Sequence, residues 1–309
     1  MKYYIVCTVN GAPGGHELAH QCCYEINKCG YDAKMYYVKA GNFNPVDAET
    51  NPKFVKYEIE HVKTLEEVDQ EGNVVIVPEG LTDWTFAFHH ATVVIWWMSV
   101  DNFLHISDVE YITAMNVVAK YHLVQSKYAE EFVKSQHVDD EKIVWLSDYI
   151  GDIYGQFILP GEYRKRRVVF NPKKGFQNLE PLIERCPDIE WVPLINMTEE
   201  EMVLNMQLAR VYIDFGNHPG KDRIPREAVV CGCCIMTNMD GSAAYYEDVP
   251  IDSKYKFAAP IDYDNAEIVL RELIDNFSTH FSEFDSYRSM VKSEKEYFNK
   301  CIRELTERI

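Results

Sequence analysis

The sequence predicts an α/β protein with two halves, each built around a parallel sheet whose strands alternate with helices. Three observations lead to this prediction. The chain opens with a strand at 3–9, a helix at 16–29 and a strand at 32–38, which is typical of a parallel sheet with crossover helices. The same alternation restarts near residue 167. Finally, a length of 309 residues fits two domains of roughly 150 residues each.

The first half continues with short apolar runs separated by polar segments. Such runs are typical of strands buried on both faces, and the stretches between them have helical spacing. We expect further strands at 73–78, 92–98, 121–125 and 142–146, and helices at 81–89, 109–119 and 127–135. The alternation lapses between 147 and 164, where glycine and proline accumulate, so we predict a linker there.

The second half repeats the alternation with shorter connections. We expect strands at 167–170, 189–192, 211–214, 233–237 and near 257, and helices at 175–186, 198–208, 224–231 and 265–276. From residue 281 onward the pattern is that of a charged helix. The predicted domains are therefore 1–150, 151–280 and a C-terminal helix at 281–309.

The overall charge argues against one class of partner. A net charge of −18 lacks the basic footprint of nucleic-acid binders, so no nucleic acid is expected as a partner. The basic run Arg164–Arg167 is a local exception. We interpret it as a solvated linker or strand entry, with contact to phosphate or an anionic membrane surface as the alternative.

Cysteine usage and hydropathy point to a cytoplasmic protein. The nine cysteines show no recurring metal-site spacing, which indicates reduced and mostly buried thiols. The N-terminus turns polar too soon for a signal peptide. The longest apolar run, Ala91–Met98, is far shorter than the roughly 20 residues that span a bilayer.

The most informative stretch runs from 212 to 237. A buried strand leads into a Gly/Pro loop, a short helix and a second buried strand, and the loop is crowded with charge. The beginning of a helix after a parallel strand offers backbone N–H donors and a partial positive charge, which suit phosphate. This stretch therefore predicts a phosphorylated ligand bound by His218, Lys221, Asp222 and Arg223.

The same stretch carries a resemblance to a known family. Residues 227–237, EAVVCGCCIMT, resemble the Glu-Ala-x-x-Cys-Gly-x-Pro-Val-x-x signature of family 4-type glycosyltransferases, which have the GT-B fold. The resemblance implies that Glu227 holds the ribose hydroxyls of a nucleotide sugar and that the amides of 222–224 approach its diphosphate. The family usually has a further glutamate where this chain has Pro219, so His218, Lys221 or Asp222 would contact the sugar instead.

Three further loops resemble parts of the same site. In NPKKG, at 171–175, Lys173 and Lys174 resemble the basic loop that neutralises the donor diphosphate. Gly14, Gly15 and Glu17 resemble the glycine-rich loop that opens the N-terminal domain of GT-B enzymes. Each loop also has an ordinary interpretation as turn chemistry. Ser242 follows a later strand and is a candidate for closing the donor site.

Two carboxylates are candidates for a general base. Asp101 and Glu79 each follow a buried strand, where parallel-sheet active sites are built. His16, Glu17 and His105 are further candidates. A cap, turn or surface role is the alternative for each of these residues. GT-B enzymes generally work without a bound divalent metal, and this chain has no DxD-like cluster in a suitable loop. We therefore expect neither a metal nor a cofactor.

The resemblance as a whole implies an α/β, GT-B type architecture. Two Rossmann-like domains would face a cleft, and the C-terminal helix would cross back to the N-terminal domain. The implied function is sugar transfer from a nucleoside diphosphate sugar to a hydroxyl acceptor, a glycan or a lipid-linked molecule, in surface polysaccharide synthesis at the inner face of a membrane. A nucleotide-sugar epimerase and a catalytically silent binding subunit stay open as alternatives. The nucleotide base, the sugar, the stereochemical outcome and the oligomeric state are left open by the sequence.

Overall fold

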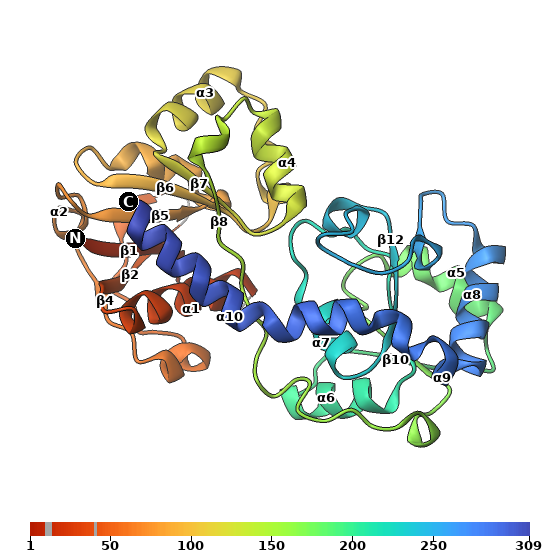
Figure 1. Cartoon of the computed structure of the whole chain (residues 1–309). Helices are drawn as coiled ribbons and strands as arrows, with labels where there is room; N and C mark the ends of the chain where they lie inside the picture. Colours follow the sequence, from red (N-terminus) through yellow and green to blue (C-terminus); the bar gives the residue numbers. More distant parts are fainter. Residues whose placement is uncertain (10–13, 40–41) are drawn as a thin grey trace. The chain divides into compact units, whose positions relative to one another are not determined.

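The computed structural model describes residues 1–9, 14–39 and 42–309, which form two compact units (Figure 1). Unit 1 comprises Met1–Asp148 together with Glu296–Ile309, and unit 2 comprises Tyr149–Lys295. The predicted loop at 10–13 lies outside the described residues. Each unit is an α/β structure with its own sheet, as the sequence predicted.

Unit 1 is built on a sheet in the order β3-β2-β1-β5-β6-β7-β8, with β4 also paired to β2. All described pairs are parallel except β2 with β3. The strands are β1 (Lys2–Thr8), β2 (Asp32–Lys39), β3 (Asn42–Pro45), β4 (His61–Val62), β5 (Val74–Pro78), β6 (Thr92–Trp97), β7 (Tyr121–Val124) and β8 (Ile143–Trp145). The α-helices are α1 (Gly14–Lys28), α2 (Leu65–Val68), α3 (Val109–Val118) and α4 (Lys127–Ser135), and the short 3-10 helices are η1 (Pro52–Tyr57), η2 (Glu79–Ala87), η3 (Val100–Asn102) and η4 (Asp140–Lys142).

The main error of the sequence prediction in unit 1 is the helix at 81–89. The structure has the 3-10 helix η2 there, with a kink at Leu81 and the side chains of Leu81 and Trp84 buried. The sequence has helical spacing here, but burial of these two large side chains next to Gly80 sets the local backbone geometry, and the result is a 3-10 helix. The short strands β3 and β4 were also missed, because two to four residues are too few to show a period.

Unit 2 is built on five parallel strands in the order β10-β9-β11-β12-β13. They are β9 (Arg167–Phe170), β10 (Glu190–Pro193), β11 (Val211–Asp214), β12 (Cys234–Asn238) and β13 (Lys256–Phe257). The helices are α5 (Phe176–Arg185), α6 (Glu199–Leu208), α7 (Arg223–Val230), α8 (Tyr263–Asp275), α9 (Phe277–His280) and α10 (Asp285–Arg308), with 3-10 helices η5 (Gly161–Tyr163), η6 (Gly241–Ala244), η7 (Ser253–Tyr255) and η8 (Phe281–Phe284). Helix α10 begins in unit 2, and its residues from Glu296 belong to unit 1.

The strand order places a topological switch point in each sheet. In unit 2 the chain moves from β9 outward to β10 and then returns to the other side at β11, so the switch lies between β9 and β11. In unit 1 the corresponding point lies between β1 and β5. Ligands of open parallel sheets bind at such points, beside the carboxyl ends of the strands. The predicted loops at 171–175 and 215–222 flank the switch point of unit 2.

The basic run Arg164–Arg167 is largely structural. Arg164 is buried, and its guanidinium donates to the backbone oxygens of Leu159, Met206, Ala209 and Cys231. Arg167 is buried as well and pairs with Glu190. Only Lys165 and Arg166 are exposed, so the run as a whole is no solvated basic patch. Within the described residues, no helix is long and apolar enough to cross a membrane.

Candidate functional site

Close glycine packing brings the predicted donor loops of unit 2 together. Gly175 has a φ of 59°, and a Cβ there would lie 2.5 Å from Cα of Gly216. A Cβ on Gly216 would in turn lie 2.7 Å from Cβ of Lys174. The loop after β9 therefore touches the loop after β11 through positions where only glycine fits. Gly241, with φ 50°, packs in the same way against the carbonyl oxygen of His218.

The two helices that follow these loops begin without a side-chain cap. Helix α5 has Gly175 as its N-cap, and the Asp222 side chain at the N-cap of α7 makes no capping hydrogen bond. The N-terminal N–H groups of a helix lack intrahelical partners and usually receive a side-chain oxygen. Five other α-helices follow that rule, whereas α9 has no side-chain cap either: α2, α3, α4, α6 and α8 are capped by Thr64, Asp108, Ser126, Thr198 and Asp262. Uncapped helix starts at the switch point are suited to an anion.

Asp222 does not cap its helix because its carboxylate bonds elsewhere. The Lys174 ammonium donates to Oδ1 at 2.8 Å, and Nδ1 of His218 lies 2.9 Å from Oδ2. Burial would raise the pKa of Asp222, but the His218 and Lys174 cations outweigh it and lower that pKa. Asp222 therefore stays ionised and joins the two loops.

Lys221 and Arg226 are engaged by one carboxylate of helix α10. Glu294 is 2% exposed and accepts from Lys221 Nζ and from Arg226 Nη1, each at 2.8 Å. Arg226 is fully buried and also donates to the carbonyl oxygens of Lys221 and Asp222. This network holds the backbone of the Gly/Pro loop in place. Sequence analysis missed both Arg226 and Glu294, since nothing local marks a pair separated by 68 residues.

Glu227, the predicted ribose carboxylate, is 5% exposed. Its Oε1 lies 3.5 Å from Nε of Arg223, one helical turn earlier. Burial raises the pKa of Glu227, opposed by the Arg223 and Arg226 cations. Ser242 lies nearby, with its hydroxyl donating to the Gly220 carbonyl at 2.6 Å and its amide to the His218 carbonyl at 2.9 Å. Lys173 is exposed at the start of the basic loop, so its ammonium is accessible to a ligand.

Unit 2 therefore brings together the following predicted donor residues at one sheet edge: Lys173, Lys174, His218, Lys221, Asp222, Arg223, Glu227 and Ser242. Their roles toward a ligand stay predictions. His218 is 1% exposed and Lys221 is ion-paired, so neither presents a bare side chain to solvent. Asp214, at the end of β11, joins the group and was not singled out by the sequence.

At the carboxyl edge of unit 1, Glu79 is the most perturbed acid. It is 4% exposed and accepts from the Met98 amide at 3.1 Å and from Asn102 Nδ2 at 2.9 Å. Burial raises the pKa of Glu79 to about 7, only partly offset by these neutral donors. A carboxyl with such a pKa exchanges a proton near neutral pH, as a general base must. Gly15 lies near the end of the Met98 side chain, since a Cβ there would meet it at 3.7 Å.

The other predicted residues of unit 1 have structural partners. The Tyr128 hydroxyl donates to the half-buried Asp101 at 3.0 Å. Glu17 is 4% exposed and forms ion pairs with Lys56 at 3.1 Å and Lys53 at 3.6 Å, so it ties α1 to η1. Gly14 is exposed at the start of α1. None of these observations tests a role in binding or catalysis.

A polar cluster around two histidines was only partly anticipated. His16 Nε2 lies 2.8 Å from the Thr8 hydroxyl, and His20 Nε2 lies 2.8 Å from the Tyr37 hydroxyl. His20 Nδ1 lies 2.6 Å from the His16 carbonyl oxygen. Burial lowers the pKa of both imidazoles, so they are neutral at pH 7. The spacing of four residues on α1 is the sequence signal for this cluster, because it places both rings on one helix face.

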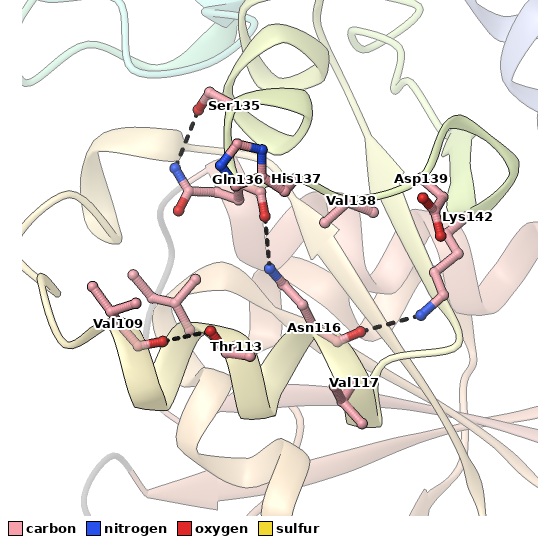
Figure 2. A pocket seen from close by; sticks show the side chains of 11 residues that line it. Val109, Thr113, Asn116, Val117, Ser135, Gln136, His137, Val138, Asp139 and Lys142 are labelled. Atoms are coloured by element: carbon pink, nitrogen blue, oxygen red, sulfur yellow. Dashed lines mark hydrogen bonds between the residues drawn. The ribbon is translucent and has the colours of Figure 1, made fainter.

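Unit 1 also has a hollow that none of the predicted site residues and neither of the two histidines lines. It measures about 460 Å³ and is lined by the ends of α3 and α4, including Val109, Asn116, His137 and Lys142 (Figure 2). Lys142 donates to the carbonyl oxygen of Asn116, whose side chain donates to Gln136. These residues lead into β7 and β8, so the hollow lies at the amino edge of the sheet, and no predicted site residue lines it.

Comparisons with known proteins agree on the fold. No family model matches the chain, and no curated protein matches it in sequence. Sucrose-phosphate synthase from Thermosynechococcus elongatus is similar in structure, with 11% identity, a TM-score of 0.69 and coverage of 99% of this chain and 98% of that one. HepE from Anabaena, in complex with UDP and glucose, has 10% identity, a TM-score of 0.71 and full coverage of both chains. The lipopolysaccharide outer core galactosyltransferase WaaB has 13% identity and a TM-score of 0.68, with coverage of 100% and 99%.

The fold is that of the GT-B glycosyltransferases. The predicted fold class is thereby confirmed, because each similarity extends over nearly the whole of both chains. In the GT-B fold the two sheets correspond to two Rossmann-like domains, which agrees with the parallel strand orders found here. At 10–13% identity the likeness concerns the fold alone.

Proposed function

We propose that the protein is a glycosyltransferase that uses a nucleoside diphosphate sugar as donor and a hydroxyl group as acceptor. The observation that carries the proposal is the pair of uncapped helix starts at the switch point of unit 2, beside Lys173 and Lys174. Transfer requires stabilisation of the diphosphate that leaves as the glycosidic bond breaks. Fixed N–H donors and lysine ammonium groups supply that stabilisation.

The proposed roles follow from position. Lys173, Lys174 and Arg223 bind the diphosphate, and Glu227 accepts from the ribose hydroxyls. In unit 1, Glu79 or Asp101 serves the acceptor hydroxyl, and Glu79 is favoured by its pKa of about 7. No divalent metal is needed if these cations carry the charge. Solved structures with the same fold support the donor class, since HepE has been crystallised with UDP-glucose.

The acceptor proposed is a glycan or a lipid-linked molecule of surface polysaccharide synthesis. The similar galactosyltransferase of the lipopolysaccharide outer core supports this choice. A lipid-linked acceptor would require peripheral contact with a membrane, which vesicle co-sedimentation with and without anionic lipid tests.

A silent binding subunit is the second candidate. Its support is that Lys174 and Lys221 are both ion-paired within the protein and that Pro219 replaces the family glutamate. Such a subunit would bind ligand without turning it over. An epimerase would convert the donor in the absence of any acceptor, so donor turnover measured with and without acceptor separates the three activities.

The first test is thermal unfolding in the presence of UDP, GDP, dTDP, CMP or ADP, each with and without EDTA. A nucleotide at about 100 times its dissociation constant adds about 2.7 kcal/mol to the free energy of unfolding. We expect one nucleoside diphosphate to stabilise the protein equally with and without EDTA. Stabilisation that EDTA abolishes would contradict the metal-free proposal, and no stabilisation by any nucleotide would contradict the donor site.

Paired variants locate the site. Lys173→Gln is expected to weaken nucleotide binding by on the order of tenfold, since it removes one charge from the diphosphate site. Lys165→Gln is the matched control, an exposed lysine before β9 that the proposal leaves outside the site. Equal affinity in the two variants would overturn the assignment of Lys173.

A further inference from the structure

The His218 imidazole is enclosed between two carboxylates in the middle of the proposed donor site. Its side chain is 1% exposed, with Nδ1 2.9 Å from Asp222 Oδ2 and Nε2 3.9 Å from Asp214 Oδ1. Nε2 has no hydrogen-bond partner within the described structure. The backbone of His218 is held in place, because its carbonyl accepts from the Ser242 amide and packs against Gly241.

The carboxylates around His218 are themselves fixed. Asp222 is shared with Lys174 at 2.8 Å, and Asp214 accepts from the Tyr212 hydroxyl at 2.8 Å and the Gly216 amide at 3.0 Å. The groups that face the imidazole are therefore Asp214 and Tyr212 from β11, Asp222 from the start of α7 and Lys174 from the basic loop. Asp222 is an anion and Lys174 a cation at neutral pH, whereas burial and the Asp222 charge raise the pKa of Asp214, opposed by His218 and by its hydrogen bonds.

The charge of this cluster depends on one proton. With His218 protonated, two cations, His218 and Lys174, lie beside the Asp222 carboxylate. Loss of the His218 proton makes the cluster more negative by one charge, beside the helix starts proposed to receive a diphosphate. A like charge within several ångströms opposes binding of an anion, most strongly where water is excluded. Asp214, His218 and Asp222 also lie close enough to hold a divalent cation, so the test includes one.

The local electrostatics favour the protonated ring. Burial alone lowers the pKa of His218, but the hydrogen bond to Asp222 and the charge of Asp214 outweigh burial, and the pKa is raised. The nearby Lys174 cation opposes that rise only in part. His218 is therefore charged at neutral pH and loses its proton above the usual range of a histidine.

We propose that His218 is a positioning residue for the donor diphosphate: as an imidazolium it neutralises Asp222, so that the Lys174 ammonium is left to attract the ligand. The inference rests on the proposed function, because it assumes an anionic donor at these loops. His218 itself need not touch the ligand.

The test uses UDP-glucose, whose diphosphate is esterified at both ends and keeps its charge between pH 6 and 9. The dissociation constant is measured by calorimetry for the full-length protein and its variants. At pH 7, His218→Gln is expected to weaken binding by on the order of tenfold. Adding Asp222→Asn to that variant removes the uncompensated charge and is expected to restore most of the affinity. A purely structural role for His218 predicts no such rescue.

The pH profile provides the second readout. For the unaltered protein the dissociation constant is expected to rise by about tenfold in all as pH increases through the pKa of His218, and then to level off at the value of His218→Gln. The pKa itself is measured from the imidazole resonances by NMR. His280→Gln is the matched control, because His280 is also held between two carboxylates of unit 2, Glu272 and Glu283, away from the donor loops. It should leave the profile unchanged.

The outcomes separate the inference from the proposed function. Binding that is independent of pH, or equal in the unaltered protein and His218→Gln, would overturn the inference and leave the donor site intact. If UDP-glucose, GDP-mannose and ADP-glucose all fail to bind at any pH, both proposals fail. If binding appears only on addition of Mg²⁺ or Zn²⁺ and is lost in His218→Gln, the cluster is a metal site and the inference is wrong.

Discussion

Two carboxylates at the carboxyl edges of the two sheets, the half-buried Asp222 and the buried Glu79, have pKa values shifted in opposite directions. Asp222 in unit 2 has a lowered pKa, whereas burial raises that of Glu79 in unit 1 to about 7. Burial acts to raise the pKa of both carboxylates, so burial alone cannot explain why the two pKa values shift in opposite directions. Asp222 has a lysine and a histidine as partners, while Glu79 has an amide and an asparagine. The cationic partners keep Asp222 ionised, so that it links the two loops of unit 2. The neutral partners leave Glu79 with a pKa near neutral pH, which suits proton transfer.

The loops and helices at the carboxyl edges of the two sheets differ as well. In unit 2 the loops are packed glycine against glycine, and two helix starts are left for an anion. In unit 1 the first helix holds Glu17 in ion pairs with lysines and orients His16 and His20. One edge is therefore suited to binding a charged group, and the other to handling a proton.

The largest expected effect is on the ion network of unit 2. Arg226→Met leaves Glu294 buried with Lys221 as its remaining described cation, and such broken pairs cost about 3–5 kcal/mol in free energy of unfolding. Urea denaturation measures the loss. Arg166→Met is the control, since its pair with Asp188 is exposed and contributes about 0–1 kcal/mol. An equal loss of unfolding free energy in Arg226→Met and Arg166→Met would show that burial does not strengthen the Arg226–Glu294 pair.

The next effect concerns Glu79 and has a definite sign. Its pKa is raised in the folded state, so the folded protein holds the proton more tightly, and stability falls as pH rises from the unfolded pKa of 4.5 to about 7. Glu79→Gln removes that dependence. We expect the variant to be more stable than the unaltered protein at pH 8 by about 3 kcal/mol and similar to it at pH 4.5.

Sugar transfer by Glu79→Gln gives an independent readout. If Glu79 is the base, the variant loses transfer activity while its nucleotide affinity is unchanged. Full activity would leave Asp101, with its tyrosine partner, as the candidate. A stability difference that does not vary with pH would mean that Glu79 does not titrate in this range.

A smaller effect tests the glycine contact between the loops. Gly175→Ala introduces a Cβ 2.5 Å from Gly216, whereas Gly72→Ala in unit 1 meets nothing within 4 Å, and both positions have positive φ. The two variants therefore have similar backbone strain, and only Gly175→Ala forces an added Cβ against neighbouring atoms. We expect Gly175→Ala to be less stable by about 1–3 kcal/mol more than Gly72→Ala and to bind nucleotide more weakly. Equal stability would mean that the loops separate at little cost.

The predictable parts of the molecule are those encoded by neighbouring residues. Strand β11 was placed at its observed limits, because three apolar residues and Asp214 lead into a Gly/Pro loop. The loops at 171–175 and 215–222 could be recognised for the same reason. The Arg226–Glu294 pair and the lysines around Glu17 could not, since they join elements far apart in sequence. Helix η2 was mistaken for an α-helix because helical spacing does not distinguish the two when burial sets the geometry.

The uncapped start of α7 has a consequence for how the protein responds to its ligand. A diphosphate bound there would act as the cap that Asp222 does not provide, so the first turn of the helix would be completed by a molecule from outside the chain. Hydrogen exchange at the amides of Arg223 and Ile224 would then report occupancy directly, since Pro225 has no amide hydrogen. The ligand would become part of the secondary structure of unit 2, and the emptied site would be the frayed end of a helix.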